Sequence, residues 1–168
     1  MVILPTMNKK GLYLFIALLV PVLIFVFLKF FGKNQFDIPI YYQNGLDSLS
    51  ITCQVSFPKP YVLPDSIPLL SGYQAHLLSL DTTRVAEKYL SGIGESFDAN
   101  EVGVTSINSF PFSTAQVERL KSCVLMLNPP WTVVLIDNQR RIRGYYNPKT
   151  QEETDRMVVE LKILLKKY

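Results

Sequence analysis

The longest apolar stretch of the chain lies near the N-terminus, where residues 11–31 contain a single charged side chain, Lys29. A helix of this length extends about 31 Å at about 1.5 Å per residue, which matches the hydrocarbon thickness of a bilayer. Pro21 interrupts the stretch, but membrane helices tolerate proline. The residues at the C-terminal end of the stretch, 29–33, are mostly bulky or charged, whereas a signal-peptide cleavage site requires small residues. The pattern predicts an uncleaved transmembrane anchor over residues 11–31, preceded by a short tail, residues 1–10.

The region after the anchor contains one alternating segment and one proline-rich segment. We expect a linker over residues 32–48 and a folded domain over residues 49–168. Polar and apolar residues alternate from Ser48 to Phe57, which is typical of a half-buried strand. Residues 58–68 contain four prolines and predict an extended connection that is neither a helix nor a central strand.

The remaining residues alternate between strand and helix patterns. Short apolar stretches predict strands at residues 75–80, 102–107, 131–136 and 141–146. The order is strand, helix, strand, helix, strand, strand, helix, and the turn near residue 138 imposes one antiparallel hairpin. This order predicts an α/β domain with a mixed sheet flanked by helices, which is the order of a thioredoxin-like fold.

Three capping patterns predict where the helices of the domain begin. Asp81 and Thr82 can cap the first helix, and Ser113 with Gln116 forms a capping box for the second. The second helix carries one apolar stripe and ends at Asn128-Pro129-Pro130; the stripe consists of Val117, Leu120, Val124 and Leu127. Thr150 with Glu153 predicts another capping box, which begins the last helix.

Charge is distributed unevenly along the chain. The formal net charge is +3, but Lys9, Lys10, Lys29 and Lys33 flank the anchor, and residues 34–168 carry 13 basic and 14 acidic groups. The folded domain therefore lacks the concentrated basic face that nucleic-acid binding requires, and we expect no nucleic-acid partner. Because lysines lie on both sides of the anchor, charge alone leaves its orientation open.

The end of the third predicted strand carries the most specific motif. The segment Asp137-Asn138-Gln139-Arg140-Arg141-Ile142-Arg143-Gly144-Tyr145-Tyr146 resembles the hairpin of bacterial Sco (SenC-like) proteins, which typically reads D-x-x-G-R-I-R-G-Y-Y. Phe31-Gly32-Lys33-Asn34 and Pro39-Ile40-Tyr41-Tyr42 are similar to the stretch just outside the anchor of some members. The final helix and its distance from the hairpin also fit, whereas the middle of the chain is supported by element order alone.

The resemblance implies a thioredoxin-like domain that is anchored in the bacterial inner membrane and faces the periplasm. Sco proteins help to assemble the copper centre of cytochrome oxidase. Their site combines a C-x-x-x-C pair after the first core strand with a distant histidine just before the hairpin. Thiolates and imidazole suit Cu(I), and two nearby thiols can also cycle through a disulfide.

The chain lacks the residues of that site. The loop after the strand at residues 75–80 reads Asp81-Thr82-Thr83-Arg84, and Pro129-Pro130 stands where the family places its histidine. Arg140 replaces the hairpin glycine, so the turn must use a different or strained backbone. We therefore expect a degenerate, non-catalytic member with no metal or cofactor, which binds a respiratory-complex assembly protein.

Cys53 and Cys123 are the only cysteines, and their pattern leaves three interpretations open. The default is two buried small side chains. The second is a structural disulfide, which suits an oxidising compartment and would close a long loop, stabilising the domain by about 4 kcal/mol. The third is a redox or copper pair, which would keep thiol or copper chemistry in the protein and requires Cα atoms within about 7 Å.

Four other side chains carry weaker signals. Arg140, Arg141 and Arg143 crowd one hairpin; a solvated turn is the default, and contact with a partner protein or anionic lipid headgroups is the alternative. His76 is the single histidine and is expected to be a hydrogen-bonded or edge histidine without a ligand role.

Two residues beside the predicted strands carry weak signals. Asp81 is expected to cap a helix. Trp131 with Pro129-Pro130 leaves a surface anchor open as an alternative, but the strand that follows favours core packing. The sequence contains no G-x-S-x-G, no phosphate-binding glycine loop, no H-E-x-x-H and no C-x-x-C. A structural membrane-surface module unrelated to oxidase assembly is the remaining alternative function.

Overall fold

The computed structural model describes residues 9–31, 36–46, 53, 57–67, 69, 72–81, 83 and 85–166. The chain divides into two compact units, Met1–Phe36 and Asp37–Tyr168.

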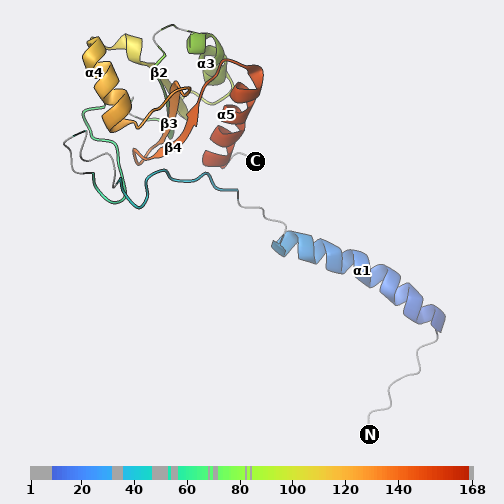
Figure 1. Ribbon diagram of the computed structural model, residues 1–168. Helices are drawn as coiled ribbons and strands as arrows, with labels where there is room; N and C mark the ends of the chain where they lie inside the picture. The colour runs from blue at the N-terminus through green and yellow to red at the C-terminus, as the bar shows by residue number, and fades with distance from the viewer. Residues whose placement is uncertain are drawn as a thin grey trace. The chain divides into compact units, whose positions relative to one another are not determined.

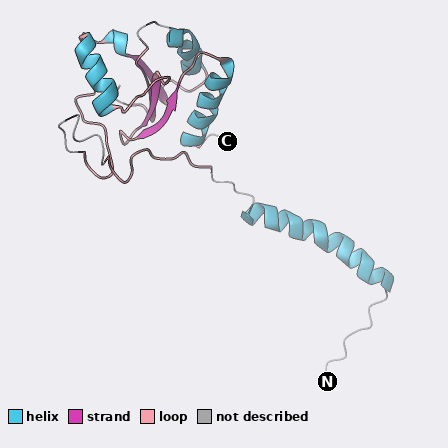
Figure 2. Cartoon of the chain, viewed as in Figure 1, coloured by secondary structure: helices cyan, strands magenta, loops and turns pink. Residues whose placement is uncertain are grey.

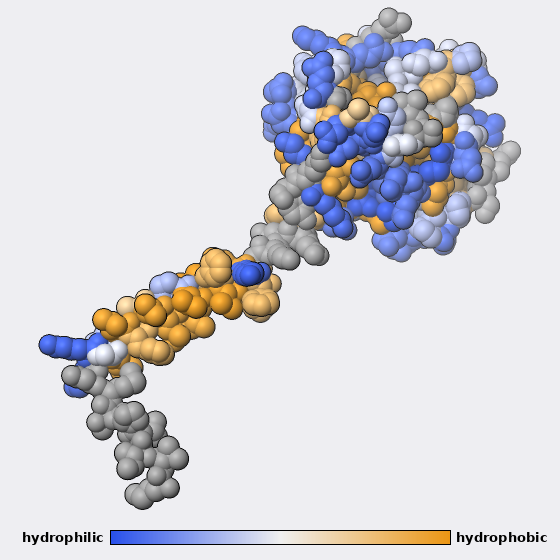
Figure 3. All heavy atoms as spheres, turned by 180° about the vertical axis from the view of Figure 1, so that it is seen from behind, coloured by the Kyte–Doolittle hydropathy of each residue, from blue (hydrophilic) through white to orange (hydrophobic). Residues whose placement is uncertain are grey.

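The N-terminal unit contains one long apolar helix, α1 (Lys9–Phe31), with Pro21 inside it. The helix begins two residues before the predicted anchor and ends with it. None of its residues is buried against protein, and apolar side chains cover its surface (Figure 3). Within the described residues it is the one helix long and apolar enough to cross a membrane.

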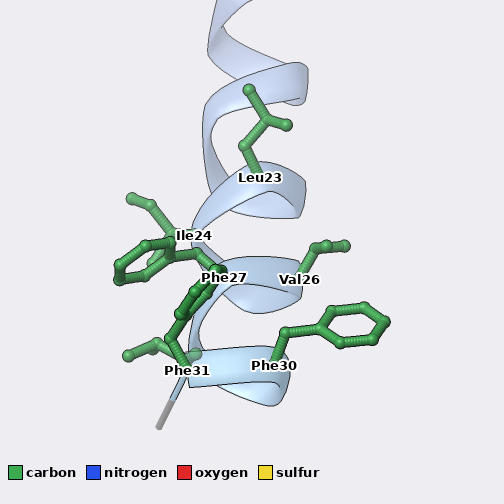
Figure 4. Close-up of a pocket in the computed structure, with 7 residues that line it drawn as sticks. Leu23, Ile24, Val26, Phe27, Phe30 and Phe31 are labelled. Atoms are coloured by element: carbon green, nitrogen blue, oxygen red, sulfur yellow. The ribbon is translucent and has the colours of Figure 1, made fainter.

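A shallow hollow lies on the C-terminal half of α1 (Figure 4). Its walls are hydrocarbon side chains, and the rings of Phe27 and Phe31 stack with their centroids 4.8 Å apart. A hollow on the outside of a single helix with no polar wall suits acyl chains and offers no group that would orient a polar ligand.

The second unit is built on a four-stranded mixed sheet (Figures 1 and 2). Its strands are β1 (Ala75–Ser79), β2 (Val102–Ser106), β3 (Val133–Asp137) and β4 (Ile142–Tyr146), in the order β2-β1-β3-β4. Strand β1 is parallel to β2 and antiparallel to β3, and β3 and β4 form an antiparallel hairpin. The four predicted strands of residues 75–146 are confirmed, with ends that differ by two residues at most.

Two apolar clusters cover the two faces of the sheet. On one face lie helices α3 (Val85–Glu95) and α5 (Gln151–Leu164) (Figure 1). Their side chains, such as Leu90 and Met157, pack against β1 and β3. On the other face, α4 (Thr114–Arg119) contributes Val117, and the extended segment 57–67 contributes Tyr61. The predicted α/β arrangement with helices on both faces is therefore confirmed.

The predicted second helix changes geometry halfway along its length. It begins with the predicted Ser113–Gln116 capping box, but α4 ends at Arg119 and a π-helical turn, η2 (Leu120–Val124), follows. Met126 then takes a left-handed backbone with a φ of 48°. The expectation of one regular helix that reaches Leu127 is wrong, because the helical part ends at Val124 and the left-handed residue Met126 precedes Leu127.

The last helix keeps only one half of its predicted capping box. The Thr150 side chain accepts a hydrogen bond from the Glu153 amide and caps α5. The Glu153 carboxylate instead pairs with Arg156, 2.9 Å away.

The segment before the sheet is packed over a longer range than predicted. Ile38 is buried, and the Tyr41 amide donates a 3.0 Å hydrogen bond to the Ile142 carbonyl on the edge strand β4. Residues 37–46 therefore belong to the folded unit, and the predicted linker over residues 32–48 is wrong for them. The physical reason is the open edge of β4, which this segment partly covers.

The predicted strand over residues 48–57 lies mostly outside the described residues. Cys53 is described and has a helical backbone, and Phe57 lies in a loop. A strand at Cys53 is therefore wrong.

Candidate functional site

The loop after β1, where the resemblance places a pair of cysteines, is occupied by a helix cap. The Asp81 carboxylate accepts hydrogen bonds from the Thr83 amide at 2.9 Å, from the Thr83 hydroxyl at 2.6 Å and from the Ala86 amide at 2.8 Å. Burial alone would raise the pKa of Asp81, but these bonds and one from the Val85 amide lower it below its ordinary value. The Asp81 carboxylate therefore caps the start of α3, and the predicted helix cap is confirmed.

Cys53 and Cys123 form a disulfide, with their Cα atoms 5.5 Å apart. The default interpretation, two buried free thiols, is therefore wrong. Cys53 is 4% exposed, whereas Cys123 is half-buried on η2. The Ser122 hydroxyl lies 3.7 Å from the Cys123 Sγ atom. The bond joins residues 70 positions apart.

Two tyrosines secure the chain immediately after Cys123. The Tyr61 hydroxyl donates to the Val124 carbonyl at 2.7 Å, and the Tyr145 hydroxyl donates to the Leu125 carbonyl at 2.6 Å. These bonds satisfy carbonyls that the end of a helix leaves unpaired. Burial raises the pKa of Tyr61 to about 12 and also raises the pKa of Tyr145. Both tyrosines therefore stay neutral donors at physiological pH.

A groove of about 560 Å³ lies between α4, η2 and the residues that lead into β3. Its walls include apolar side chains and two cations: Leu80, Leu127, Pro130, Trp131, Lys121 and Lys149. Ser122, the neighbour of Cys123, also lines it. The groove therefore lies directly beside the disulfide-bearing turn, at the end of β1.

Trp131 stands at the groove with 37% of its surface exposed. The guanidinium carbon of Arg156 lies 5.8 Å from the centre of the indole ring. The expectation that Trp131 packs in the core is wrong, because β3 begins two residues later, at Val133, and Trp131 lies in the turn before it.

The arginines of the β3–β4 hairpin do not form a solvated turn. Arg143 is 5% exposed, and its guanidinium lies 3.0 Å from the Asp37 carboxylate and 3.4 Å from the Asp137 carboxylate. Arg141 pairs with Asp137 at 2.7 Å. The solvated-turn interpretation is wrong for Arg143, because its charge is used inside the domain. Contact of a partner or a lipid with the exposed parts of Arg140 and Arg141 stays a prediction.

Arg140 combines an unusual backbone with a long-range contact. Its φ is 61°, the left-handed region, as expected where the resembling hairpins have glycine. Its guanidinium donates to the carbonyl oxygens of Leu63, Pro64 and Ile67. The side chain therefore holds the loop segment 61–67 against the hairpin.

His76 is buried on the central strand β1 and is not an edge histidine. Its Nδ1 atom has no hydrogen-bond partner among the described residues, so the expectation of a hydrogen-bonded histidine is wrong for that atom. The ring of Tyr73 packs edge-on against it with centroids 5.8 Å apart. Burial lowers the pKa of His76, and the Arg140 charge lowers it further.

The described residues include no group of three or more His, Cys, Asp or Glu side chains that could hold a metal ion. Sequence reasoning missed Tyr61, Tyr145 and Arg156 as parts of this region. Their partners are distant in sequence, and no local pattern marks them.

No family model matches the sequence. No curated protein matches it either.

Proposed function

We propose that the protein is a membrane-anchored, Sco-like accessory protein with a thioredoxin-like domain, which acts by binding a partner in respiratory cytochrome oxidase assembly. The anchor is α1, and the domain lies on the periplasmic side of a bacterial inner membrane. The domain is non-catalytic. It holds no resident metal.

The observation that carries the proposal is the sheet together with its hairpin. The order β2-β1-β3-β4, with one parallel and two antiparallel pairings, agrees with a thioredoxin-like domain. The sheet combines two units, β1-α3-β2 and β3-β4-α5, which meet where β1 pairs with β3. This similarity of architecture supports the proposed fold. The activity has to be argued from the residues of the site, because a fold does not determine a function.

The hairpin motif supports the resemblance because each of its distinctive residues has a packing role. Asp137 accepts hydrogen bonds from the Gln139 and Arg141 amides and closes the turn. A Cβ atom added at Gly144 would collide with the hydroxyl of Tyr146, so only glycine fits there. The motif is therefore explained by packing alone and requires no metal or redox chemistry.

The non-catalytic part of the proposal is supported by the loop after β1. Asp81 is engaged with the start of α3, and the described residues of this loop provide no thiol or imidazole. A soft-ligand Cu(I) site needs such groups.

The disulfide supports an extracytoplasmic location for the domain. Disulfides persist in oxidising compartments such as the periplasm and are rare in the cytosol. A half-buried bond between Cys53 and Cys123 therefore agrees with a periplasmic domain behind an N-terminal anchor.

Two measurements test the proposal. The full chain, captured by an affinity tag from detergent-solubilised native membranes, is expected to bring an oxidase subunit or assembly factor with it, relative to an unrelated tagged single-pass protein. Titration of the purified chain with Cu(I) in the presence of a competing chelator is expected to show no stoichiometric binding. Submicromolar, stoichiometric Cu(I) binding would overturn the non-catalytic role, and failure to enrich any oxidase component would overturn the assembly role.

A second candidate function is thiol–disulfide exchange through Cys53 and Cys123. The observation that favours it is the half-buried Cys123, which follows a residue that lines an open groove. In this reaction a partner dithiol becomes a disulfide while the Cys53–Cys123 bond becomes two thiols. Oxidation of a model dithiol peptide by the full chain, absent in a Cys53→Ser/Cys123→Ser variant, would favour this candidate over the non-catalytic one.

A further inference from the structure

Trp131 is an exposed aromatic side chain with a cation beside its ring. That cation, Arg156, also contacts the Glu153 carboxylate at 2.9 Å and the Tyr145 carbonyl at 3.2 Å. Tryptophan supplies a large contact area at a low cost in conformational entropy. It is enriched among the residues that dominate the binding energy of protein interfaces. Trp131 therefore has the properties of an interface anchor.

Among the described residues, the charged side chains of the same groove leave one cation without an ion-pair partner. Glu118 and Lys121 line the groove and form an ion pair at 3.0 Å. Lys149 also lines the groove and has no carboxylate partner in the described part of the chain. The charge that remains for a ligand is therefore positive and lies at Lys149.

The size and charge of the groove favour a protein segment over a membrane surface. The volume of about 560 Å³ is of the order of sites that enclose a compact ligand, which is much smaller than a membrane surface. Anionic lipid recognition normally uses a cluster of about four to eight basic residues. One unpaired lysine beside a tryptophan and a proline pair does not provide such a cluster.

We propose that this groove binds an extended segment of a partner protein in which an apolar side chain contacts Trp131 and Pro130 while a neighbouring carboxylate pairs with Lys149. The inference rests on the proposed function, because it names the surface through which the domain would bind its partner. Trp131 supplies apolar contact area, and Lys149 selects acidic over basic segments.

Trp131 is the only tryptophan of the chain, so its fluorescence reports on this groove alone. The full chain in detergent micelles is titrated with a blocked octapeptide that contains one phenylalanine flanked by aspartates. A matched peptide carries lysines in place of the aspartates. A saturable change in Trp131 fluorescence is expected with the acidic peptide, and affinity for the lysine peptide is expected to be at least about tenfold weaker.

Matched variants identify the residues responsible. Lys149→Glu is expected to weaken binding of the acidic peptide about tenfold. Lys162→Glu is the control, because Lys162 is exposed on α5 and does not line the groove. Trp131→Phe, followed by calorimetry, is expected to weaken binding while leaving the unfolding midpoint close to that of the unmodified chain.

Several results would overturn the inference. These are equal affinity for the two peptides, equal effects of Lys149→Glu and Lys162→Glu, and the absence of a saturable signal. Self-association that is lost in Lys149→Glu would assign the groove to a second copy of the chain and would also overturn it. Capture of an oxidase component by Lys149→Glu as well as by the unmodified chain would refute the groove and keep the proposed function. Peptide binding without any captured oxidase component would keep the groove and refute the proposed function.

Discussion

The Arg143 guanidinium donates a 2.6 Å hydrogen bond to the carbonyl oxygen of Ile38, 105 positions earlier in the chain. The same guanidinium lies 3.4 Å from the Asp137 carboxylate, which is itself buried. Asp37 is the third partner, but its side chain is 88% exposed, so solvent screens that pair. The buried contacts with Ile38 and Asp137 are therefore the ones that tie the N-terminal segment of the domain to the hairpin.

Removal of the Arg143 side chain is expected to destabilise the domain strongly. Arg143→Ala leaves the Ile38 carbonyl without its donor and the buried Asp137 with one cation fewer. Loss of one partner of a buried pair costs about 3–5 kcal/mol, and because Arg141 still pairs with Asp137 we expect a loss near the lower end, about 3 kcal/mol. The free energy of unfolding of the full chain in detergent, measured with urea, checks this value.

Arg119→Ala is the matched control for that measurement. Arg119 is exposed at the end of α4, and a change there is expected to alter the free energy of unfolding by less than about 0.5 kcal/mol. A loss for Arg143→Ala no larger than that for Arg119→Ala would contradict the assignment of Arg143 as the link between segment and hairpin.

Arg140 allows its backbone strain and its side-chain contacts to be separated. Arg140→Ala and Arg140→Gly both lose the hydrogen bonds to Leu63, Pro64 and Ile67, but only alanine retains the cost of a φ of 61°. We expect the glycine variant to be more stable than the alanine variant by about 1 kcal/mol. We expect both to be less stable than the unmodified chain, by about 1–3 kcal/mol for the glycine variant, since the partly buried carbonyls of Leu63 and Ile67 lose a charged donor.

Urea unfolding of the three proteins under identical conditions gives both differences. If the glycine variant proved as stable as the unmodified chain, the guanidinium contacts would contribute nothing and Arg140 would be a turn residue only. If alanine and glycine gave equal stability, the left-handed conformation would not be costly at this position.

The parts of the fold that local pattern determines could be predicted from the sequence. The apolar stretches at residues 75–80 and 131–136 lie within a few residues of β1 and β3, and the Ser113–Gln116 capping box begins α4. Each of these depends on residues that are neighbours in the chain. The alternating pattern predicts a strand at Cys53, and this prediction is wrong. The side chain of Cys53 is bonded to Cys123, 70 positions away, and a local polarity pattern does not contain that constraint.

The groove and its supports depend on contacts that no local pattern encodes. Trp131 is held by Arg156 from α5, and the carbonyl of Leu125 is bound by Tyr145 from β4. Each partner pair joins two elements whose proximity follows only from the sheet order. The sequence could name Arg143 as one of a group of arginines, but its burial follows from a contact with Ile38 more than a hundred positions away.

The Cys53–Cys123 disulfide is expected to make a large contribution to stability. It closes a loop of 70 residues, and constraint of the unfolded chain over such a loop corresponds to about 4 kcal/mol. Reduction of the unmodified chain is expected to lower its free energy of unfolding by about this amount. Urea unfolding with and without a thiol reductant measures the change.

A double variant, Cys53→Ser with Cys123→Ser, provides the control for the reductant itself. Its stability is expected to match that of the reduced chain and to be unaffected by the reductant. If reduction broke the bond without changing the unfolding of the unmodified chain, the disulfide would not stabilise the domain. That result would favour a role in thiol–disulfide exchange.

His76 is expected to make the domain less stable as pH falls. Its pKa is lowered from an ordinary value of 6.5 by burial and by the Arg140 charge, and the Tyr73 ring packs against it. The unfolded chain therefore takes up its proton at a higher pH than the folded chain, so unfolding takes up protons as pH falls through about 6.5 and stability decreases. Well above pH 6.5 both states are neutral at this residue, and its contribution no longer varies with pH.

The variant His76→Gln keeps a polar side chain of similar size and cannot titrate, so it isolates this effect. The free energy of unfolding of the unmodified chain is expected to decrease more steeply than that of His76→Gln between about pH 6.5 and pH 5, at a slope of up to about 1.4 kcal/mol per pH unit. The two curves are expected to run parallel above that range, because Asp81, whose pKa is lowered, is charged in both proteins. Parallel curves throughout would mean that the folded domain accommodates a protonated His76, which its unpartnered Nδ1 atom and the neighbouring Arg140 argue against.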